Sequence, residues 1–235
     1  MKRQKKTVLV VLGGVSKERD VSLKSGKACS KAIKRLGYRV ITFDPAKKFL
    51  NEIDKLKVDI IFNALHGKGG EDGNAQSYFE YLKIPYTHSG VISSFNAMNK
   101  IISKEIFIRN KIKTPKYSLI EKTNFKIKSI KKIIKKKNIS FPVVIKPINE
   151  GSSLGVKVCN NKEKLLKEVH FLFKNYDELI LEEYIGGQEI QAAVLNSNPL
   201  GAIELIPKRL FYDYKAKYTK KAKTKHLMPA RLTKK

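Results

Sequence analysis

A lysine at the end of an apolar segment is followed closely by a loop of glycines and serines. The apolar residues 141–145 lead to Lys146, and the loop after it contains Gly151, Ser152, Ser153 and Gly155. Glycines let backbone N–H groups turn toward a bound anion, while the hydroxyls and the ammonium group add hydrogen bonds and positive charge. This pattern favours a phosphate site, although a lysine at a strand edge before a flexible turn would use the same residues.

Two polar segments come at the ends of apolar runs that we expect to be strands. Gly13-Gly14-Val15-Ser16-Lys17-Glu18 follows residues 7–12, and the glycine-rich segment Asn63–Gly73 follows the run at 58–65. Open α/β sheets bind ligands at the carboxyl ends of their strands. Ser16 could instead only cap the next helix, and a lone histidine is usually structural. A histidine within a glycine-rich loop at a strand end, here His66, more often faces a ligand.

Two further segments carry acidic and aromatic side chains. The first is Glu182-Glu-Tyr-Ile-Gly-Gly-Gln-Glu189, whose carboxylates suit an adenine amino group and ribose hydroxyls. A polar hairpin with an exposed acidic edge would have the same composition. The second is Phe211-Tyr-Asp-Tyr-Lys-Ala-Lys-Tyr218, an aromatic and basic loop whose alternative interpretation is an unstructured basic tail.

Together and in this order, the five segments resemble those of the D-alanine–D-alanine ligase family, which are ATP-grasp enzymes. Residues 66–73 are similar to the HGxxGEDG signature of that family, and residues 211–218 to its mobile loop. The resemblance extends over nearly the whole chain. It implies that ATP phosphorylates the carboxylate of one D-alanine and that the amine of a second D-alanine attacks the acyl phosphate, for peptidoglycan synthesis.

The resemblance also implies roles for individual residues. Glu18 would bind the ammonium group of the first D-alanine, and His66 would lie near its carboxylate. Glu18, Ser152 and Tyr218 would form a hydrogen-bonded triad that closes the mobile loop, and a tyrosine at position 218 goes with D-alanine as the second substrate. The residues expected to bind ATP are Lys100, Lys146 and Lys217 at the phosphates, Ser152 and Ser153 in the phosphate loop, and Glu182, Tyr184, Ile185, Glu189 and Phe211 at the adenine and ribose.

The family also requires Mg²⁺ or Mn²⁺, held by a strand aspartate and a Glu-x-Asn segment near the end of the ATP-grasp domain. After Asp213 this sequence contains no Asp or Glu, so we expect no metal ligands in this chain and a fold truncated at its C-terminus. Mg²⁺ clamps the transferring phosphate through oxygen ligands. Two hypotheses therefore stay open. The first is a ligase by descent, either as a fragment of an active enzyme or as half of a split gene whose remainder is separate. The second is a non-catalytic remnant that at most binds nucleotide or amino acid weakly. The 235 residues alone are expected to lack ligase activity.

Composition narrows the class of protein. The 235 residues are 42% hydrophobic and carry a net charge of +28, but only 7 of the 49 basic residues are arginine. Arginine is the preferred reader of bases and phosphates, so we interpret the lysines as solvated surface and expect no nucleic-acid partner. The two cysteines fit no metal site or disulfide framework, and no apolar run approaches membrane-spanning length. We therefore expect a cytoplasmic protein. The family resemblance implies D-alanine and ATP as ligands and a homodimer, and the missing metal-binding segment leaves open a separately encoded C-terminal segment.

The elements that must position these residues alternate between strands and helices. Expected strands are residues 7–12, 39–43, 58–65, 116–120, 143–146, 156–159, 179–185, 189–195 and 200–206, the last three as an antiparallel meander. Expected helices are 21–36, 45–56, 93–110, 126–137 and 162–173, with little structure after Pro207. Such alternation predicts an α/β fold with a parallel sheet covered on both faces. We expect a parallel α/β domain at 1–97, followed by an incomplete ATP-grasp fold of α+β type, with subdomains at 98–180 and 181–235.

Overall fold

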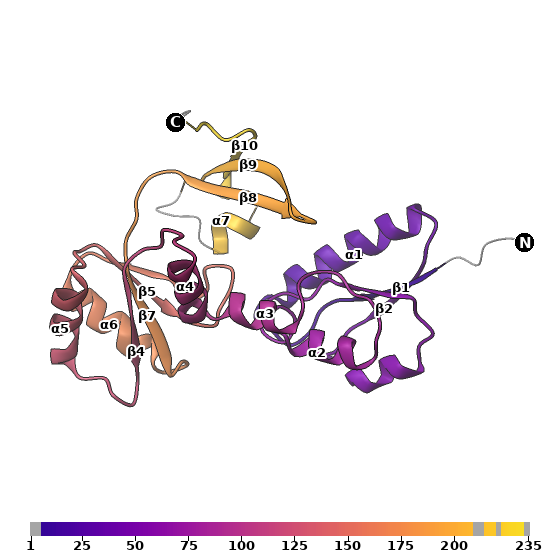
Figure 1. The fold of residues 1–235 in the computed structure, drawn as a ribbon, viewed down its shortest axis with the longest axis horizontal. Coiled ribbons are helices and arrows are strands. Elements are labelled where there is room, and N and C mark those ends of the chain that lie inside the picture. The colour runs from indigo at the N-terminus through magenta and orange to yellow at the C-terminus, as the bar shows by residue number, and fades with distance from the viewer. Residues whose placement is uncertain (1–5, 209–213, 220–221, 233–235) are drawn as a thin grey trace, which may run out of the picture. The chain divides into compact units, whose positions relative to one another are not determined.

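The chain consists of two compact units, each described here by itself (Figure 1). The structure is a computed structural model that describes residues 6–208, 214–219 and 222–232. The first unit contains Met1–Ile112 together with Asn149–Gly151, and the second contains Lys113–Ile148 and Ser152–Lys235. The subdomain boundaries expected at 97/98 and 180/181 stay predictions.

A three-stranded parallel sheet forms the centre of the first unit. Strand β1 (Thr7–Val11) lies between β2 (Arg39–Phe43) and β3 (Ile60–Asn63). All five residues of β1 are buried, which is expected for a central parallel strand that has a helical layer on both faces.

Alternate residues of β1 pack into two separate hydrophobic clusters. One contains Val8, Val10 and Leu12 and is covered by α1 (Arg19–Arg35) through Leu23 and Ile33. The other contains Leu9 and Val11 and is covered by the 3₁₀ helix η1 (Leu50–Lys55) and by α2 (Asn74–Tyr81). Because strand side chains alternate between faces, this arrangement needs an apolar residue at each of positions 8–12. The expected parallel sheet with two covered faces is confirmed.

Two of the expected helices differ from the structure. The predicted helix at 93–110 is wrong as a single element, because it is divided into α3 (Val91–Met98) and α4 (Lys100–Arg109). Asn99 between them has extended backbone, and its side chain accepts hydrogen bonds from the N–H groups of Ile101 and Ile102, so it caps α4. The segment expected to be helical at 45–56 forms only η1.

The second unit contains a four-stranded antiparallel sheet with the order β4-β7-β5-β6. Its strands are β4 (Tyr117–Glu121), β5 (Val143–Pro147), β6 (Lys157–Cys159) and β7 (Glu178–Glu183). One hydrophobic cluster joins this sheet to α5 (Ile127–Lys137) and α6 (Lys162–Leu172), with Ile130, Ile145, Leu165 and Leu181 fully buried. Figure 1 shows α5 and α6 beside this sheet.

The remaining strands form a separate antiparallel sheet with the order β10-β9-β8. These strands are β8 (Glu189–Leu195), β9 (Asn198–Ile206) and β10 (Lys225–Leu227). The expected meander of 179–206 is therefore wrong in its first part, because β7 pairs with β4 and β5 rather than with β8. The region after Pro207 also has more structure than expected, since it contains β10 and the short helix α7 (Tyr214–Tyr218).

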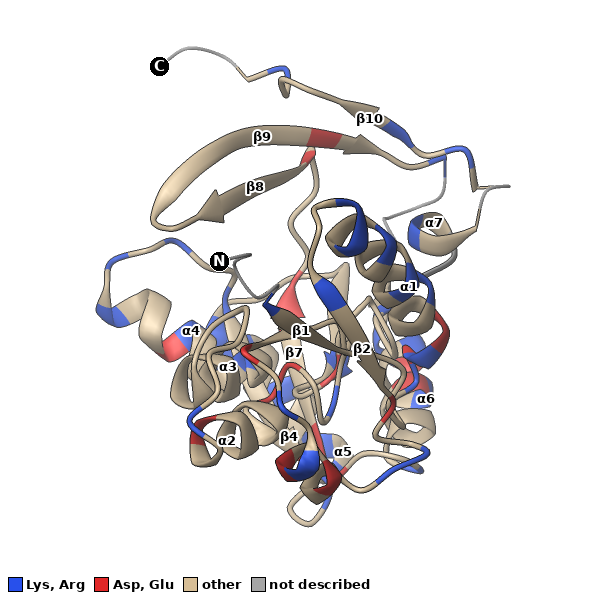
Figure 2. Cartoon of the chain, turned by 90° about the vertical axis from the view of Figure 1, so that its right-hand side faces the viewer, with Lys and Arg blue, Asp and Glu red and all other residues tan. Residues whose placement is uncertain are grey.

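Basic residues are distributed over many elements rather than gathered on one (Figure 2). Helix α5 is the most lysine-rich example: Ile130 is fully buried in the core, whereas the lysines of its last turn, Lys135, Lys136 and Lys137, are exposed. In the part of the chain that the structure describes, no helix is both long enough and apolar enough to cross a membrane.

Candidate functional site

In the first unit, Glu18 and His66 lie at the same edge of the parallel sheet. Glu18 follows β1 and His66 follows β3, and parallel strands place their carboxyl ends together. Glu18 is only 3% exposed. A Cβ atom added to Gly67 would lie 2.7 Å from Glu18 Oε2, and one added to Gly151 would lie 3.1 Å from it. The carboxylate is thus held against two glycine backbones, one of them next to His66.

Helix α1 and the loop before it fix His66 at two points. The hydroxyl of Ser16 donates to the His66 carbonyl oxygen at 2.7 Å, and Ser25 Oγ lies 3.0 Å from His66 Nε2. His66 Nδ1 faces Glu71 Oε1 at 3.9 Å, while the other oxygen of Glu71 accepts from the Gly67 N–H at 2.6 Å. The motif analysis did not assign a role to Ser25, because its proximity to His66 depends on the packing of α1.

An ion pair supports the turn that leads to Glu18. Arg19 donates to both carboxylate oxygens of Asp44, at 3.0 and 2.7 Å, and to the Gly14 carbonyl at 2.7 Å. Asp44 also accepts from the N–H groups of Gly14 and Ala46, each at 3.0 Å. The hydrogen bond from Arg19 is the main reason that the pKa of Asp44 falls to about 2, with the two backbone donors adding to the effect. Sequence reasoning missed Asp44.

A mostly apolar pocket of about 220 Å³ lies beside this turn. Its lining includes Gly13, Gly14, Leu65 and His66. The backbone of both glycine-rich segments therefore borders one concave surface, which can accept a small molecule.

Lys100 lies at the start of α4, directly after its cap. Its ammonium group donates to the Glu150 carbonyl oxygen, and Lys17 forms an ion pair of 2.8 Å with the Glu150 side chain. Glu150 and Gly151 belong to the first unit, so this unit contains the start of the glycine–serine loop as well as Glu18.

In the second unit, Lys146 and Glu182 form an ion pair on one face of the antiparallel sheet. Glu182 pairs with Val144 in the β5–β7 register, and Lys146 is two residues farther along the same strand, so the side chains share a face. The Glu182 side chain is 7% exposed and that of Lys146 is 21% exposed. The structure thus brings together a residue expected at the ATP phosphates and one expected at the adenine.

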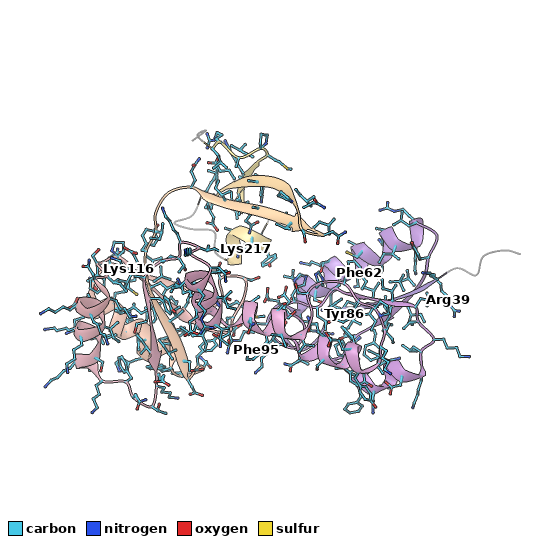
Figure 3. All side chains as sticks on the ribbon, in the orientation of Figure 1. Arg39, Phe62, Tyr86, Phe95, Lys116 and Lys217 are labelled. Atoms are coloured by element: carbon cyan, nitrogen blue, oxygen red, sulfur yellow. The ribbon has the colours of Figure 1, made fainter. Side chains whose placement is uncertain are left out.

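The glycine–serine loop contacts the aromatic segment in the second unit. Ser152 and Ser153 have φ angles of 46° and 61°, which turn the backbone sharply. Ser152 Oγ lies 2.8 Å from the hydroxyl oxygen of Tyr218, as a hydrogen bond in either direction. Tyr218 ends α7, and Lys217 precedes it on the same short helix (Figure 3). Phe211 lies outside the described residues.

A second pocket, of about 500 Å³, is lined by the segment between β7 and β8. It brings together Tyr184, Ile185 and Glu189, which the family resemblance places at the adenine and ribose. Its lining also includes Glu204 and Arg231, which the sequence did not single out.

Glu204 is 3% exposed and accepts hydrogen bonds from Arg231 Nε and Nη2 at 2.9 and 2.8 Å and from Gln188 at 3.2 Å. These donors, chiefly Arg231, lower the pKa of Glu204 to about 2. No pattern in the sequence signals this pair, because Glu204 lies in β9, whereas Arg231 lies in the segment after β10 that contacts β9.

The described residues contain no group of three or more His, Cys, Asp or Glu side chains that could hold a metal ion. We assign no residue to a metal.

Two family models match this chain. Residues 106–235 match the model described as D-ala D-ala ligase C-terminus, and residues 43–89 match the one described as D-ala D-ala ligase N-terminus. The D-alanine–D-alanine ligase of Pelagibacter ubique (strain HTCC1062) is 53% identical over 229 residues, which are 97% of this chain and 74% of that protein. The chain belongs to the D-alanine–D-alanine ligase family.

Solved structures of this family have the same fold. The D-alanine–D-alanine ligase from Bacillus anthracis complexed with ATP matches with a TM-score of 0.79 and 29% identity, covering 97% of this chain and 72% of that one. The VanG D-Ala:D-Ser ligase from Enterococcus faecalis also has a TM-score of 0.79 and 29% identity, covering 98% and 78%. The expected combination of a parallel α/β domain and an ATP-grasp fold is confirmed, and the family is one of ATP-dependent ligases.

Proposed function

We propose that this chain belongs to an ATP-dependent ligase that joins two D-alanine molecules for peptidoglycan synthesis. The observation that carries the proposal is the 53% identity to a D-alanine–D-alanine ligase over 97% of the chain. The γ-phosphoryl group of ATP is transferred to the carboxylate of the first D-alanine. The amine of the second D-alanine then attacks the acyl phosphate carbon, and the tetrahedral intermediate releases phosphate as the peptide bond forms.

On the amino-acid side, Glu18 binds the ammonium group of the first D-alanine and His66 lies near its carboxylate. This assignment is supported by the position of the Glu18 carboxylate against the backbone of Gly67, next to His66. A buried carboxylate is a strong partner for an ammonium group, because both charges lose little to solvent screening.

On the nucleotide side, Lys100, Lys146 and Lys217 neutralise phosphates, and Ser152 and Ser153 donate to them. Glu182, Tyr184, Ile185, Glu189 and Phe211 bind the adenine and ribose. The pocket that Tyr184, Ile185 and Glu189 share supports their part of this assignment, and the ion pair of Lys146 with Glu182 supports placing both at one ligand. The hydrogen bond between Ser152 and Tyr218 supports a role for Tyr218 in closing the loop that carries Lys217.

In enzymes of this family, a bound Mg²⁺ ion would neutralise charge on the phosphate group that is transferred. We assign no residue to it, and the roles given above are those of this chain's own side chains. We further propose a cytoplasmic location, where ATP is available, and we propose a homodimer or association with a separately encoded C-terminal segment. Catalysis and simple nucleotide binding remain the two hypotheses to be separated.

The test is an assay of the protein in the full length that its gene encodes, supplied with ATP, Mg²⁺ and D-alanine. We expect phosphate and D-alanyl-D-alanine in equal amounts, and a large loss of both in Lys146→Met. A parallel reaction with D-alanine and D-serine tests the second substrate. Faster formation of the mixed product would overturn the choice of D-alanine, and nucleotide binding without any product would favour the non-catalytic hypothesis.

A further inference from the structure

Three serines of α1 and its preceding loop bond to the segment that follows β3. Ser16 donates to the His66 carbonyl at 2.7 Å, Ser22 donates to the Ala64 carbonyl at 2.6 Å, and Ser25 contacts the imidazole ring of His66 at 3.0 Å. Ser22 and Ser25 are three residues apart, so they share one face of the helix. Of these contacts, only that of Ser25 involves a side chain that we assign to substrate binding, the imidazole of His66.

We propose that Ser25 is a positioning residue for His66, which it holds in the tautomer that carries the proton on Nε2. The inference rests on the proposed role of His66 at the carboxylate of the first D-alanine. By accepting the Nε2 proton, Ser25 fixes both the ring orientation and the identity of the remaining ring nitrogen, Nδ1.

The hydroxyl group has a single proton and several neighbours that could accept it, so the preferred acceptor decides the direction of the hydrogen bond to His66. Ser25 Oγ lies 3.0 Å from the Val21 carbonyl oxygen and 3.3 Å from that of Ser22. Carbonyl oxygens can only accept, and a serine within a helix commonly donates to the carbonyl four residues earlier. With its proton directed to Val21, Ser25 Oγ can only accept from His66, which requires a proton on Nε2.

The other ring nitrogen has a different environment. Nδ1 faces the half-exposed Glu71 side chain at 3.9 Å, which is beyond hydrogen-bonding distance. The His66 side chain as a whole is 30% exposed, so the ring is partly open to a ligand. Among the described residues, Ser25 thus makes the short polar contact with the His66 ring, and its removal should let the ring rotate.

The tautomer can be measured directly by long-range ¹H–¹⁵N NMR of the chain with labelled histidine. The chain has four histidines, and His66 is assigned from the signal lost in His66→Asn. Two others serve as internal references, because each contacts a carbonyl oxygen and must donate to it. His88 does so through Nε2 at 2.8 Å, and His170 does so through Nδ1 at 2.8 Å.

We expect neutral His66 to give the pattern of His88, and to become a mixture of tautomers in Ser25→Ala while Ser25→Thr keeps the wild-type pattern. Ser30→Ala is the matched control. Ser30 lies on the same helix and donates to the carbonyl of Gly26 at 2.7 Å, again four residues earlier, so its loss removes the same helix contact without touching a histidine. A His66 signal like that of His170, or one unchanged in Ser25→Ala, would overturn the proposal.

Kinetics of the full-length protein then separate this proposal from the proposed function. Loss of one hydrogen bond predicts a KM for D-alanine about 3- to 10-fold higher in Ser25→Ala, with the KM for ATP unchanged and with rescue in Ser25→Thr. If Ser25→Ala leaves the KM for D-alanine unchanged while His66→Asn raises it, positioning by Ser25 is wrong. If His66→Asn also leaves it unchanged, the assignment of His66 to the substrate is wrong, whatever its tautomer.

Discussion

Replacing Asp44 by asparagine tests how strongly the turn before Glu18 is held. Oδ1 of Asp44 accepts three of its hydrogen bonds, from Arg19 Nη1, Gly14 N and Ala46 N, and an amide oxygen can take over all three. Oδ2 accepts from Arg19 Nη2 at 2.7 Å, and the amide NH₂ group of asparagine would place a donor against that donor. One charge-assisted hydrogen bond is therefore lost.

Such a bond contributes about 2 kcal/mol when it is partly buried, so we expect the free energy of unfolding of the first unit to fall by about that amount at neutral pH. The pKa of Asp44 is lowered from 3.8 to about 2 in the folded chain. The stabilisation is thus fully present above the unfolded value of 3.8 and is lost as the pH falls through about 2. The difference between wild type and variant should shrink across this window, because a protonated carboxyl group resembles the amide.

Urea unfolding at a series of pH values measures the difference in unfolding free energy between wild type and variant. Protection of the β1 amides from hydrogen exchange reports on the first unit. The matched control is Asp177→Asn, which makes the same chemical change at a carboxylate that is 88% exposed and 3.7 Å from Lys122. Its effect should stay below about 0.5 kcal/mol, as is usual for an exposed pair. The reasoning is refuted if Asp44→Asn behaves like this control at neutral pH, or if its effect stays constant down to the lowest pH.

Three further predictions each concern one residue and its immediate surroundings. Lys146→Met should weaken ATP binding about 10-fold or more in calorimetry, because a charge-assisted contact is lost, and an unchanged Kd would remove Lys146 from the phosphate site. Gly67→Ala should lower both stability and D-alanine affinity more than Gly69→Ala does. Both glycines have positive φ, but only at Gly67 would the new Cβ lie 2.7 Å from Glu18. Equal effects of the two substitutions would mean that backbone strain alone matters. Burial raises the pKa of Cys159 to about 11, so its thiol should react with a disulfide reagent at neutral pH only after unfolding, and rapid labelling of the folded chain would contradict its buried position.

The sequence predicted the layers of the first unit well because its signals are local. Residues 7–12 are continuously apolar, which is typical of a strand covered on both faces, and the structure shows that arrangement. The position of Glu18 beside the loop of His66 also follows from two parallel strands ending at one edge. What could not be predicted is the break at Asn99, because residues on either side of it favour a helix and only the capping hydrogen bonds reveal the division.

Sequence patterns also could not predict contacts between residues that are far apart in the chain. The pairing of β7 with β4 and β5, rather than with β8, depends on which strands meet in three dimensions, and a glycine turn after residue 185 suggests a hairpin equally well. In the same way, the contact of Arg231 with Glu204 depends on the pairing of β10 with β9 and on the segment after β10, and no local motif encodes either. The candidate site residues were found from motifs, whereas the side chains that hold them, such as Ser25 and Asp44, were not.

The hydroxyl group of Ser22 has a consequence for the dynamics of the first unit. It donates to the Ala64 carbonyl at the end of β3 and accepts from the Gly13 N–H at the end of β1, at 2.6 and 2.8 Å, so one buried atom joins two strand ends and a helix. Local opening of either glycine-rich segment would leave this hydroxyl group without its partners in an apolar environment, which is unfavourable. The amide hydrogen of Gly13 should therefore exchange with solvent only when the whole sheet unfolds, and the edge that bears Glu18 behaves as part of the cooperative core rather than as a flexible loop.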